Sequence, residues 1–189
     1  MPAAIVTREE ALARIAECFR SLGYEGASLS ALTEASGLGK GSLYNYFPGG
    51  KEQMAAEVLA HIDAWFEAEV FAPLRKSGDA HAAIAAMFEA TERYFHGGGR
   101  VCLVGVFALD ATRDRFAAAV QSYFTRWVQA LARALKRGGV PEPRARAEDI
   151  VAGIQGALTL ARALNEPALL RRRLHEMRKQ IDQALPAAR

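Results

Sequence analysis

The hydrophobic residues of this chain recur with the spacing of amphipathic α-helices, and no stretch alternates as a half-buried strand would. The first apolar stripe comprises Leu12, Ile15, Phe19 and Leu22. Before it, Thr7-Arg8-Glu9-Glu10 has the pattern of a capping box, in which the Thr7 hydroxyl and the Glu10 carboxylate each accept a hydrogen bond from a free backbone N–H. We therefore predict a helix that begins after Thr7 and ends at Gly23.

Eight further helices are predicted between glycine and proline residues. The first two are short and cover residues 28–36 and 40–47. The others are predicted at residues 51–72, 79–96, 102–111, 114–137, 147–164 and 167–185. The fold class is therefore all-α, with about nine helices and the short ones first.

Composition and charge narrow the class of protein. The chain has 189 residues, 51% hydrophobic residues and a net charge of +3, which favours a packed globule over a disordered or polycationic chain. Cys18 and Cys102 lie far apart in the sequence, which is typical of a reducing compartment. The longest apolar run, residues 101–109, is shorter than the roughly 20 residues of a membrane span. We expect a soluble, cytoplasmic protein with no membrane contact.

No enzyme signature is present in the sequence. The four histidines, at positions 61, 81, 96 and 175, lack the spacing of a metal-binding motif. Gly97-Gly98-Gly99 joins two predicted helices and follows no strand, so it does not predict a phosphate-binding loop. We expect no catalytic activity, no metal and no cofactor.

The segment from Ser28 to Lys51 carries the most specific pattern. Two short helices meet at Ser36-Gly37-Leu38. The helix predicted after Thr7 is expected to cover the apolar residues of this segment, which are Leu29, Leu32, Leu38, Leu43 and Phe47. Leu43 and Phe47, at i and i+4, then define the inner face of the second short helix. Its outer face would present Lys40, Gly41, Ser42, Tyr44, Asn45 and Tyr46. Such groups read bases and phosphates, so the pattern favours a helix-turn-helix over a plain helical hairpin with its tyrosines in the core.

This segment resembles the DNA-binding head of the tetracycline-repressor (TetR) family of bacterial transcription regulators. The resemblance is carried, in order and spacing, by Gly37-Leu38, Lys40-Gly41-Ser42-Leu43-Tyr44, Tyr46-Phe47-Pro48 and Lys51-Glu52. The extra glycine in Phe47-Pro48-Gly49-Gly50-Lys51 resembles a subgroup that includes multidrug- and flavonoid-responsive repressors. The resemblance implies a DNA-binding domain at residues 1–52 and an effector-binding and dimerisation domain at residues 53–189.

The resemblance also implies roles for individual residues toward a double-stranded DNA operator. Ser28 would donate to a phosphate while it caps its helix, and Lys51 would hold another phosphate. The residues expected in the major groove are Lys40, Gly41, Ser42 and Asn45, and those expected at the DNA backbone are Tyr44 and Tyr46. The chain departs from the family pattern at Thr33, Gly39 and Tyr46, where alanine, a hydroxyl-bearing cap and histidine are usual.

The charge of the head bears on how strongly salt should weaken binding. Residues 1–52 contain five basic and six acidic side chains, so affinity must come from the placement of single cations. We expect two or three phosphates to be neutralised per head.

A homodimer is expected, because one short recognition helix reads only a few base pairs. Two stripes on the last helix pair form the predicted interface: Gly153, Gly156, Ala157, Leu160 and Leu164, and then Leu170, Leu174, Met177 and Ile181. Packing within the chain is the alternative for both stripes. The basic residues Arg171, Arg172, Arg173, Arg178 and Lys179 are interpreted as a solvated helix face rather than a DNA contact.

The resemblance further implies a small-molecule effector held among the later helices. The candidate lining residues are Ile62, Trp65, Phe66, Phe107, Tyr123 and Trp127, with Gln155 as a polar member. The same residues would also suit an ordinary core. We expect an apolar, aromatic inducer that favours a conformer with misplaced heads and thereby weakens DNA binding.

Two alternatives to a ligand-released repressor remain open from the sequence. Cys102, predicted at the start of a helix and close to Arg100, could sense electrophiles or oxidants, or it could be a small buried hydrophobe. The chain could also be a helical ligand-binding or adaptor protein without specific DNA binding.

Overall fold

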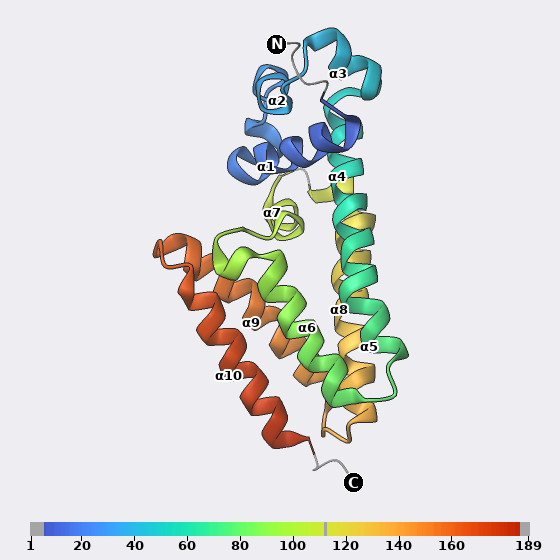
Figure 1. Ribbon diagram of the computed structural model, residues 1–189, viewed down its shortest axis with the longest axis vertical. Helices are drawn as coiled ribbons and strands as arrows, with labels where there is room; N and C mark the ends of the chain where they lie inside the picture. The colour runs from blue at the N-terminus through green and yellow to red at the C-terminus, as the bar shows by residue number, and fades with distance from the viewer. Residues whose placement is uncertain (1–5, 112, 186–189) are drawn as a thin grey trace. The chain divides into compact units, whose positions relative to one another are not determined.

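The computed structural model describes residues 6–111 and 113–185, and every regular element in that part of the chain is helical (Figure 1). The helices are α1 (Arg8–Gly26), α2 (Leu29–Ser36), α3 (Lys40–Tyr46), α4 (Gly50–Phe66), α5 (Ala72–Lys76), α6 (Ala80–Tyr94), α7 (Leu103–Leu109), α8 (Ala117–Arg137), α9 (Pro143–Ala163) and α10 (Ala168–Ala184). A π-helical turn, Glu67–Phe71, joins α4 to α5. If α4, the π turn and α5 are counted as one helix, the described residues form nine α-helices. The all-α prediction is confirmed.

The chain divides into two compact units, each described separately below. The head unit comprises residues 1–63 and 103–120, and the core unit comprises residues 64–102 and 121–189. The head unit therefore contains the predicted DNA-binding segment together with the first part of α4, all of α7 and the start of α8. It is larger than the predicted domain at residues 1–52, because α7 packs against α1.

Helix α1 begins as its sequence predicts and bends near its end. The Thr7 N–H donates to Glu10 Oε2 at 2.9 Å, and the Glu10 N–H donates to Thr7 Oγ1 at 3.2 Å. The hydrogen bond that the Glu10 carboxylate accepts from the Thr7 backbone N–H holds the pKa of Glu10 below its usual value. The sequence analysis predicted that the helix ends at Gly23, and this was wrong. Gly23, with φ at 70°, instead kinks the helix, which continues to Gly26. The kink leaves Leu22 49% exposed and turns Tyr24 into the interior.

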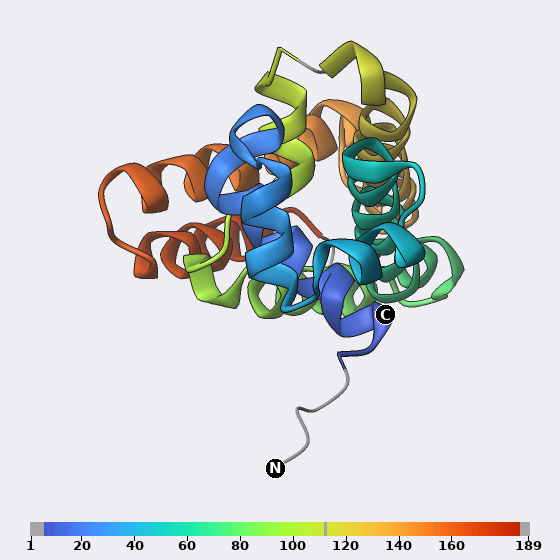
Figure 2. The ribbon, with the colours of Figure 1, turned by 90° about the horizontal axis from the view of Figure 1, so that it is seen from above.

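The turn between α2 and α3 is held by short-range hydrogen bonds (Figure 2 shows these helices from above). Ser36, which is fully buried, donates to the Thr33 carbonyl at 2.9 Å and accepts from the Leu38 N–H at 3.3 Å. Gly37 adopts the left-handed conformation, with φ at 73°, that ends α2. Leu29, the first residue of α2, is 37% exposed rather than covered by α1.

Pro73 does not stop the long helix, contrary to the sequence prediction. Proline has no N–H for the carbonyl four residues earlier, and its ring crowds that carbonyl. The chain accommodates Pro73 by a π turn, in which the Ala72 N–H donates to the Glu67 carbonyl five residues back. The helix then continues to Lys76, and both Phe66 and Phe71 stay buried.

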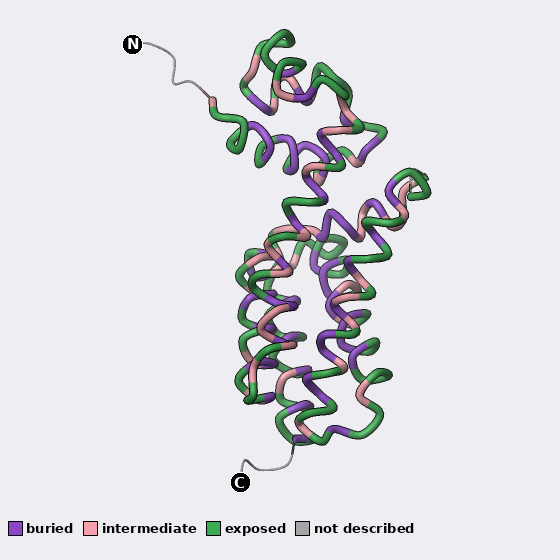
Figure 3. Tube along the Cα trace, turned by 90° about the vertical axis from the view of Figure 1, so that its right-hand side faces the viewer, coloured by how far each residue is buried: buried purple, intermediate pink, exposed green. Residues whose placement is uncertain are grey.

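In the core unit, α10 packs along α9 and α6, and each of these helices buries one side and exposes the other (Figure 3). Gly98 has a φ of 106°, and a Cβ there would collide with the Pro167 carbonyl, so the turn after α6 closely approaches the start of α10. Helix α9 starts at Pro143 rather than at residue 147. Proline is tolerated in a first helical turn because the N–H that it lacks would have no partner there.

Among the described residues, no helix combines the length and the apolar character that crossing a membrane requires.

Candidate functional site

Helix α3, the third helix of the head, presents a polar, solvent-facing surface. Leu43 is fully buried in α3, and Phe47 is fully buried directly after it. The exposed positions of this helix are Lys40, Gly41, Ser42, Tyr44 and Asn45, which we call the α3 face. No atom outside the helix backbone lies within 4 Å of a Cβ built on Gly41, so this face is open for close approach. It is a surface that could meet the edges of bases in a groove.

Three other predicted DNA-binding residues already have partners within the head. The Ser28 hydroxyl accepts from the Ala31 N–H at 3.1 Å, which confirms its capping role and leaves its own proton free to donate. The Tyr46 hydroxyl donates to the Val6 carbonyl at 3.4 Å, and its side chain is half-buried. Lys51 Nζ donates to a backbone carbonyl of the α1 end, that of Glu25, at 3.3 Å.

Most cations of the head are engaged in internal contacts. Arg8 pairs with Glu57, and Arg20 pairs with Glu17 at 2.8 Å. Arg14 donates to the Ser36 carbonyl at 3.3 Å. Within the described residues up to position 52, Lys40 is the basic side chain that has no hydrogen bond or ion pair of its own.

Tyr24 joins three segments of the head unit. Its ring lies 5.9 Å from the rings of Phe19 and Phe107 and 5.3 Å from that of Phe116, measured between centroids. Arg115 donates to the Tyr24 hydroxyl at 3.0 Å, a bond that raises the pKa of Arg115, and Lys51 Nζ lies 4.5 Å from the ring centroid. Tyr24 thus links the end of α1 to α4 through Lys51, to α7 through Phe107 and to the 3-10 turn Arg113–Phe116 through Arg115. The sequence analysis missed Tyr24 and Arg115, whose only local signal is a tyrosine that follows Gly23.

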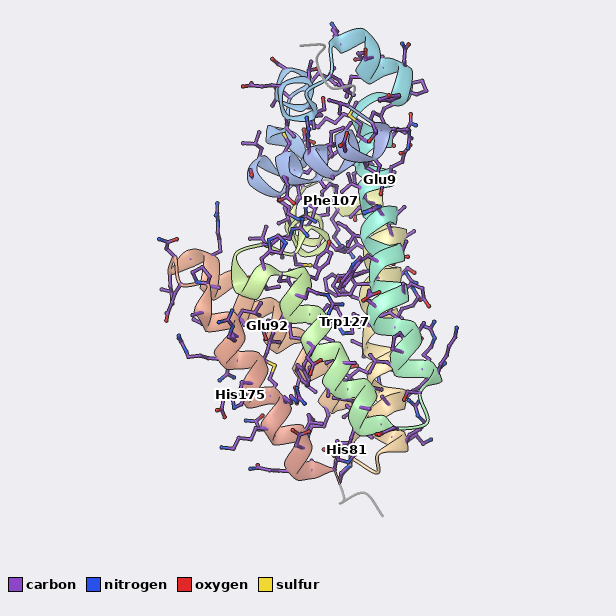
Figure 4. The ribbon with its side chains drawn as sticks, in the orientation of Figure 1. Glu9, His81, Glu92, Phe107, Trp127 and His175 are labelled. Atoms are coloured by element: carbon purple, nitrogen blue, oxygen red, sulfur yellow. The ribbon has the colours of Figure 1, made fainter. Side chains whose placement is uncertain are left out.

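The predicted effector-lining residues separate into two groups. Phe107, labelled in Figure 4, is fully buried beside Tyr24 in the head unit, and Ile62 is also buried there. The others belong to the core unit, where aromatic rings form one cluster. Its members, which we call the core cluster, are Trp65, Phe66, Phe71, Tyr94, Phe95, Tyr123 and Trp127.

Phe66 lies at the centre of the core cluster. Its ring centroid lies 5.0 Å from that of Tyr123, 5.2 Å from that of Trp127 and 5.9 Å from that of Phe71. Such edge-on and tilted pairs each add to the stabilisation from burial. Two surface grooves of the core unit are lined by other side chains. One, of about 410 Å³, lies between α8 and α9, and one, of about 540 Å³, lies between α9 and α10.

Three charged groups beside the core cluster are joined by ion pairs. Glu67, in the π turn, pairs with Arg75 and with Arg126, the latter at 3.1 Å. The hydrogen bond from Arg75 holds the pKa of Glu67 below its usual value. The Arg126 guanidinium also lies 5.3 Å from the ring centroid of Phe71. One carboxylate at the edge of the cluster is thus shared by two guanidinium groups.

Cys102 does not have the setting of a reactive thiol. It is 6% exposed and lies before the first residue of α7 rather than inside that helix. Arg100, the predicted activating cation, donates to the Tyr94 carbonyl at 3.4 Å. Since a redox-sensing thiol must be accessible, the sensor interpretation of Cys102 has no support here. The other cysteine, Cys18, is also buried, and burial raises the pKa of its thiol.

Only part of the predicted dimer surface is exposed on the protomer. The α10 stripe, Leu170, Leu174, Met177 and Ile181, is buried within the chain, as is Ala157 of α9. Gly153 is half-buried, with Met177 against it. The exposed part consists of Gly156, Leu160 and Leu164, which we call the α9 face; Leu160 is 51% and Leu164 61% exposed.

The basic residues of α10 lie on its solvent-exposed side, as the sequence interpretation expected. Arg171 pairs with Glu92 at 2.8 Å and Arg178 with Glu89 at 3.2 Å. In the described part of the chain, no three histidine, cysteine or acidic side chains are grouped as a metal site would need.

Two protein-family models match the chain, one in its N-terminal part and one in its C-terminal part. The family model of the tetR family of bacterial regulatory proteins matches residues 11–58. The model of the C-terminal domain of LmrA/YxaF-like transcriptional regulators matches residues 80–176.

Individual proteins agree with these matches. The chain is 28% identical over 161 residues to the HTH-type transcriptional regulator LmrA of Bacillus subtilis (strain 168). That alignment covers 82% of this chain and 86% of LmrA. It is 27% identical over 143 residues to YxaF of the same organism, an uncharacterized HTH-type transcriptional regulator. That alignment covers 74% of this chain and 75% of YxaF. The crystal structure of a TetR regulator from Legionella pneumophila superposes with a TM-score of 0.79 at 22% identity, over 98% of this chain and 100% of that one. That similarity shows a shared fold.

Proposed function

The chain belongs to the TetR family of bacterial transcriptional regulators, and we propose that it is a homodimeric repressor which a small apolar ligand releases from a pseudo-palindromic operator. The observation that carries this proposal is the α3 face, where small and polar side chains are exposed around the buried anchor Leu43.

The α3 face would enter the major groove. Ser42 and Asn45 supply hydroxyl and amide groups for base edges, and Gly41 lets the backbone come close. Lys40 supplies a cation for a phosphate, and Tyr44, which is 37% exposed, supplies a hydroxyl. Ser28 adds a hydroxyl proton at the start of α2. The internal contacts of Tyr46 and Lys51 favour roles in holding the head together.

The α9 face supports association of two copies. Two exposed leucines beside Gly156, where a Cβ would meet no neighbouring atom, form a surface on which a second helix could pack closely. A two-fold dimer would present two α3 faces to the two halves of a pseudo-palindrome.

Release by a ligand is supported by the core cluster. A ligand that inserts among these rings would stabilise an altered core conformer at the expense of the one described. If that conformer misplaces the heads, DNA affinity falls by the ratio of the ligand affinities of the two conformers.

The test is selection of genomic fragments by the full-length protein, followed by anisotropy titrations of the recovered operator in the presence of unrelated DNA. We expect Ser42→Ala to weaken specific binding, because it removes a hydroxyl from the α3 face. Ser21→Ala is the matched control, since Ser21 is also an exposed helical serine but lies on α1.

Equal binding of operator and unrelated DNA would refute the proposal in favour of an adaptor without specific DNA binding. Equal losses in the two serine variants would show that the α3 face does not read the operator.

A further inference from the structure

We propose that Asn45 selects an A·T base pair in each half of the operator, by forming two hydrogen bonds with the edge of the adenine in the major groove. The inference rests on the proposed function, because it names the base pair that the α3 face reads. Helix α3, which carries Asn45, is labelled in Figure 1.

Asn45 lies at the middle of the α3 face. An α-helix turns by about 100° per residue, so Gly41 and Asn45 each lie about 160° around the helix from the buried anchor Leu43. Ser42 and Tyr44 lie about 100° from Leu43, one on each side. Because Gly41 has no side chain, Asn45 carries the side chain closest to the middle of this face.

The amide of Asn45 is available to a base. Asn45 is exposed, and within the described residues its side chain makes no hydrogen bond. Tyr46, the next residue, differs in this respect, since its hydroxyl donates to the Val6 carbonyl at 3.4 Å. An exposed amide exchanges only its hydrogen bonds to water when it binds a base, so no internal contact of the head has to break.

The backbone around Asn45 is bare enough for a short side chain to reach a base. Asparagine holds its amide only one methylene group from the backbone, so the helix itself must come close to the groove floor. A Cβ built on Gly39 or on Gly41 would meet no side chain within 4 Å beyond those of the adjacent residues. These two glycines permit the close approach, which longer side chains would prevent.

Adenine is the base that matches a side-chain amide. An amide carries one carbonyl acceptor and one amino donor in the same plane. Adenine presents the N7 acceptor beside the N6 amino donor, so Asn45 Nδ2 would donate to N7 while Oδ1 accepts from N6.

Guanine does not match the middle of the α3 face. It presents two acceptors, N7 and O6, so its O6 would oppose the carbonyl oxygen of an amide. Guanine is read by the donors of arginine or lysine. Lys40, the cation of the α3 face, lies only about 60° around the helix from Leu43, and therefore at the edge of this face.

The experiment uses the full-length protein and the operator recovered by genomic selection. Anisotropy titrations measure its affinity for operators in which each base pair is exchanged in turn. We expect one position per half-site at which G·C in place of A·T weakens wild-type binding by about fivefold or more, as for a bidentate contact. In Asn45→Ala, this loss should fall below about twofold, while the losses at other positions remain.

A base analogue tests the adenine contact at one atom. In 7-deazaadenine a C–H group replaces N7, so the analogue still pairs with thymine but lacks the acceptor for Asn45. Placed at that position, it should weaken wild-type binding by about fivefold per half-site and leave binding by Asn45→Ala unchanged. A purely structural role of Asn45 would not produce this dependence on one atom of the base.

Ser42→Ala is the matched control. Ser42 is another exposed polar residue of α3, but it lies on the flank of the face, about 100° around the helix from Leu43. This variant should bind the operator more weakly and yet keep both the preference for A·T and the response to 7-deazaadenine.

Three results would overturn the inference while the proposed function stands. They are equal losses of affinity in Asn45→Ala for all operators, a relaxed position at which G·C is preferred, and wild-type binding that 7-deazaadenine does not weaken. Loss of the A·T preference in Ser42→Ala as well would also contradict it. Equal binding of operator and unrelated DNA by the wild type would instead overturn the proposed function, and the inference with it.

Discussion

The head commits most of its cations to its own packing, which makes the role of Lys40 in DNA binding testable by salt. Replacing Lys40 by alanine removes one unpaired ammonium group from each α3 face. Lys51→Ala is the matched comparison, since Lys51 is also a lysine of the head but its ammonium contacts the Glu25 carbonyl and the Tyr24 ring.

The expected magnitude follows from counterion release. Each neutralised phosphate contributes about 0.9 to the slope of log affinity against log salt, so two Lys40 side chains per dimer contribute about 1.8. Relative to a 1 M reference, this slope corresponds to a loss of affinity of about thirtyfold at 0.15 M salt. Because a phosphate carries no sequence information, the loss should be similar for operator and unrelated DNA.

The assay is anisotropy titration of a labelled operator at four or more salt concentrations, for the wild type and both variants. We expect Lys40→Ala to flatten the slope by about 1.8 and Lys51→Ala to leave the slope nearly unchanged while it lowers the thermal midpoint. A Lys40→Ala slope equal to that of the wild type would refute the reasoning. A slope change in Lys51→Ala as large as that in Lys40→Ala would show that Lys51 holds a phosphate in the complex, as the family resemblance implies.

Three further predictions concern association and stability. Leu160→Glu should produce a folded monomer in analytical ultracentrifugation, whereas Leu22→Glu, at a leucine of similar exposure (49% against 51%) on the head unit, should stay dimeric; two dimers would remove the α9 face from the interface. Gly37→Ala should lower the free energy of unfolding in urea by about 1–2 kcal/mol, because φ is 73° there, while Gly41→Ala should not lower it; equal changes would contradict this strain argument. Glu67→Gln should destabilise the protein by less than about 1 kcal/mol at neutral pH, since Glu67 is partly exposed. Arginine lowers the folded pKa of Glu67, so its contribution is present above the ordinary value of 4.5 and is lost as the pH falls through the lowered value; a gap between the urea midpoints of the two proteins that widens in acid would refute this.

The positions of the helices were largely determined by signals that act over a few residues. The capping box at Thr7 and the Ser28 cap start their helices in the structure as the sequence predicts. The buried pair Leu43 and Phe47 likewise follows from helical periodicity. These features depend on backbone hydrogen bonds and side-chain spacing within one or two turns, so sequence reasoning captures them.

Breakers were harder to interpret, because their effect depends on what surrounds them. Gly23 kinks α1 where a stop was predicted, since α7 and its neighbours cover Tyr24 beyond the kink. Pro73 permits a continuing helix, because burial of Phe66 and Phe71 on either side of the π turn favours one long element. Packing energy thus overrides a local penalty.

Which apolar face meets which partner was decided by the tertiary structure alone. Periodicity correctly marked Phe107 and the α10 leucines as apolar, yet Phe107 packs in the head unit, and Leu170 and Leu174 pack within the chain rather than on its surface. The sequence by itself determined the helices, the turn between α2 and α3 and the polar residues of the α3 face. The tertiary structure decided the Tyr24 cluster and the exposed α9 face, because contacts between residues distant in sequence depend on packing that helical periodicity does not encode.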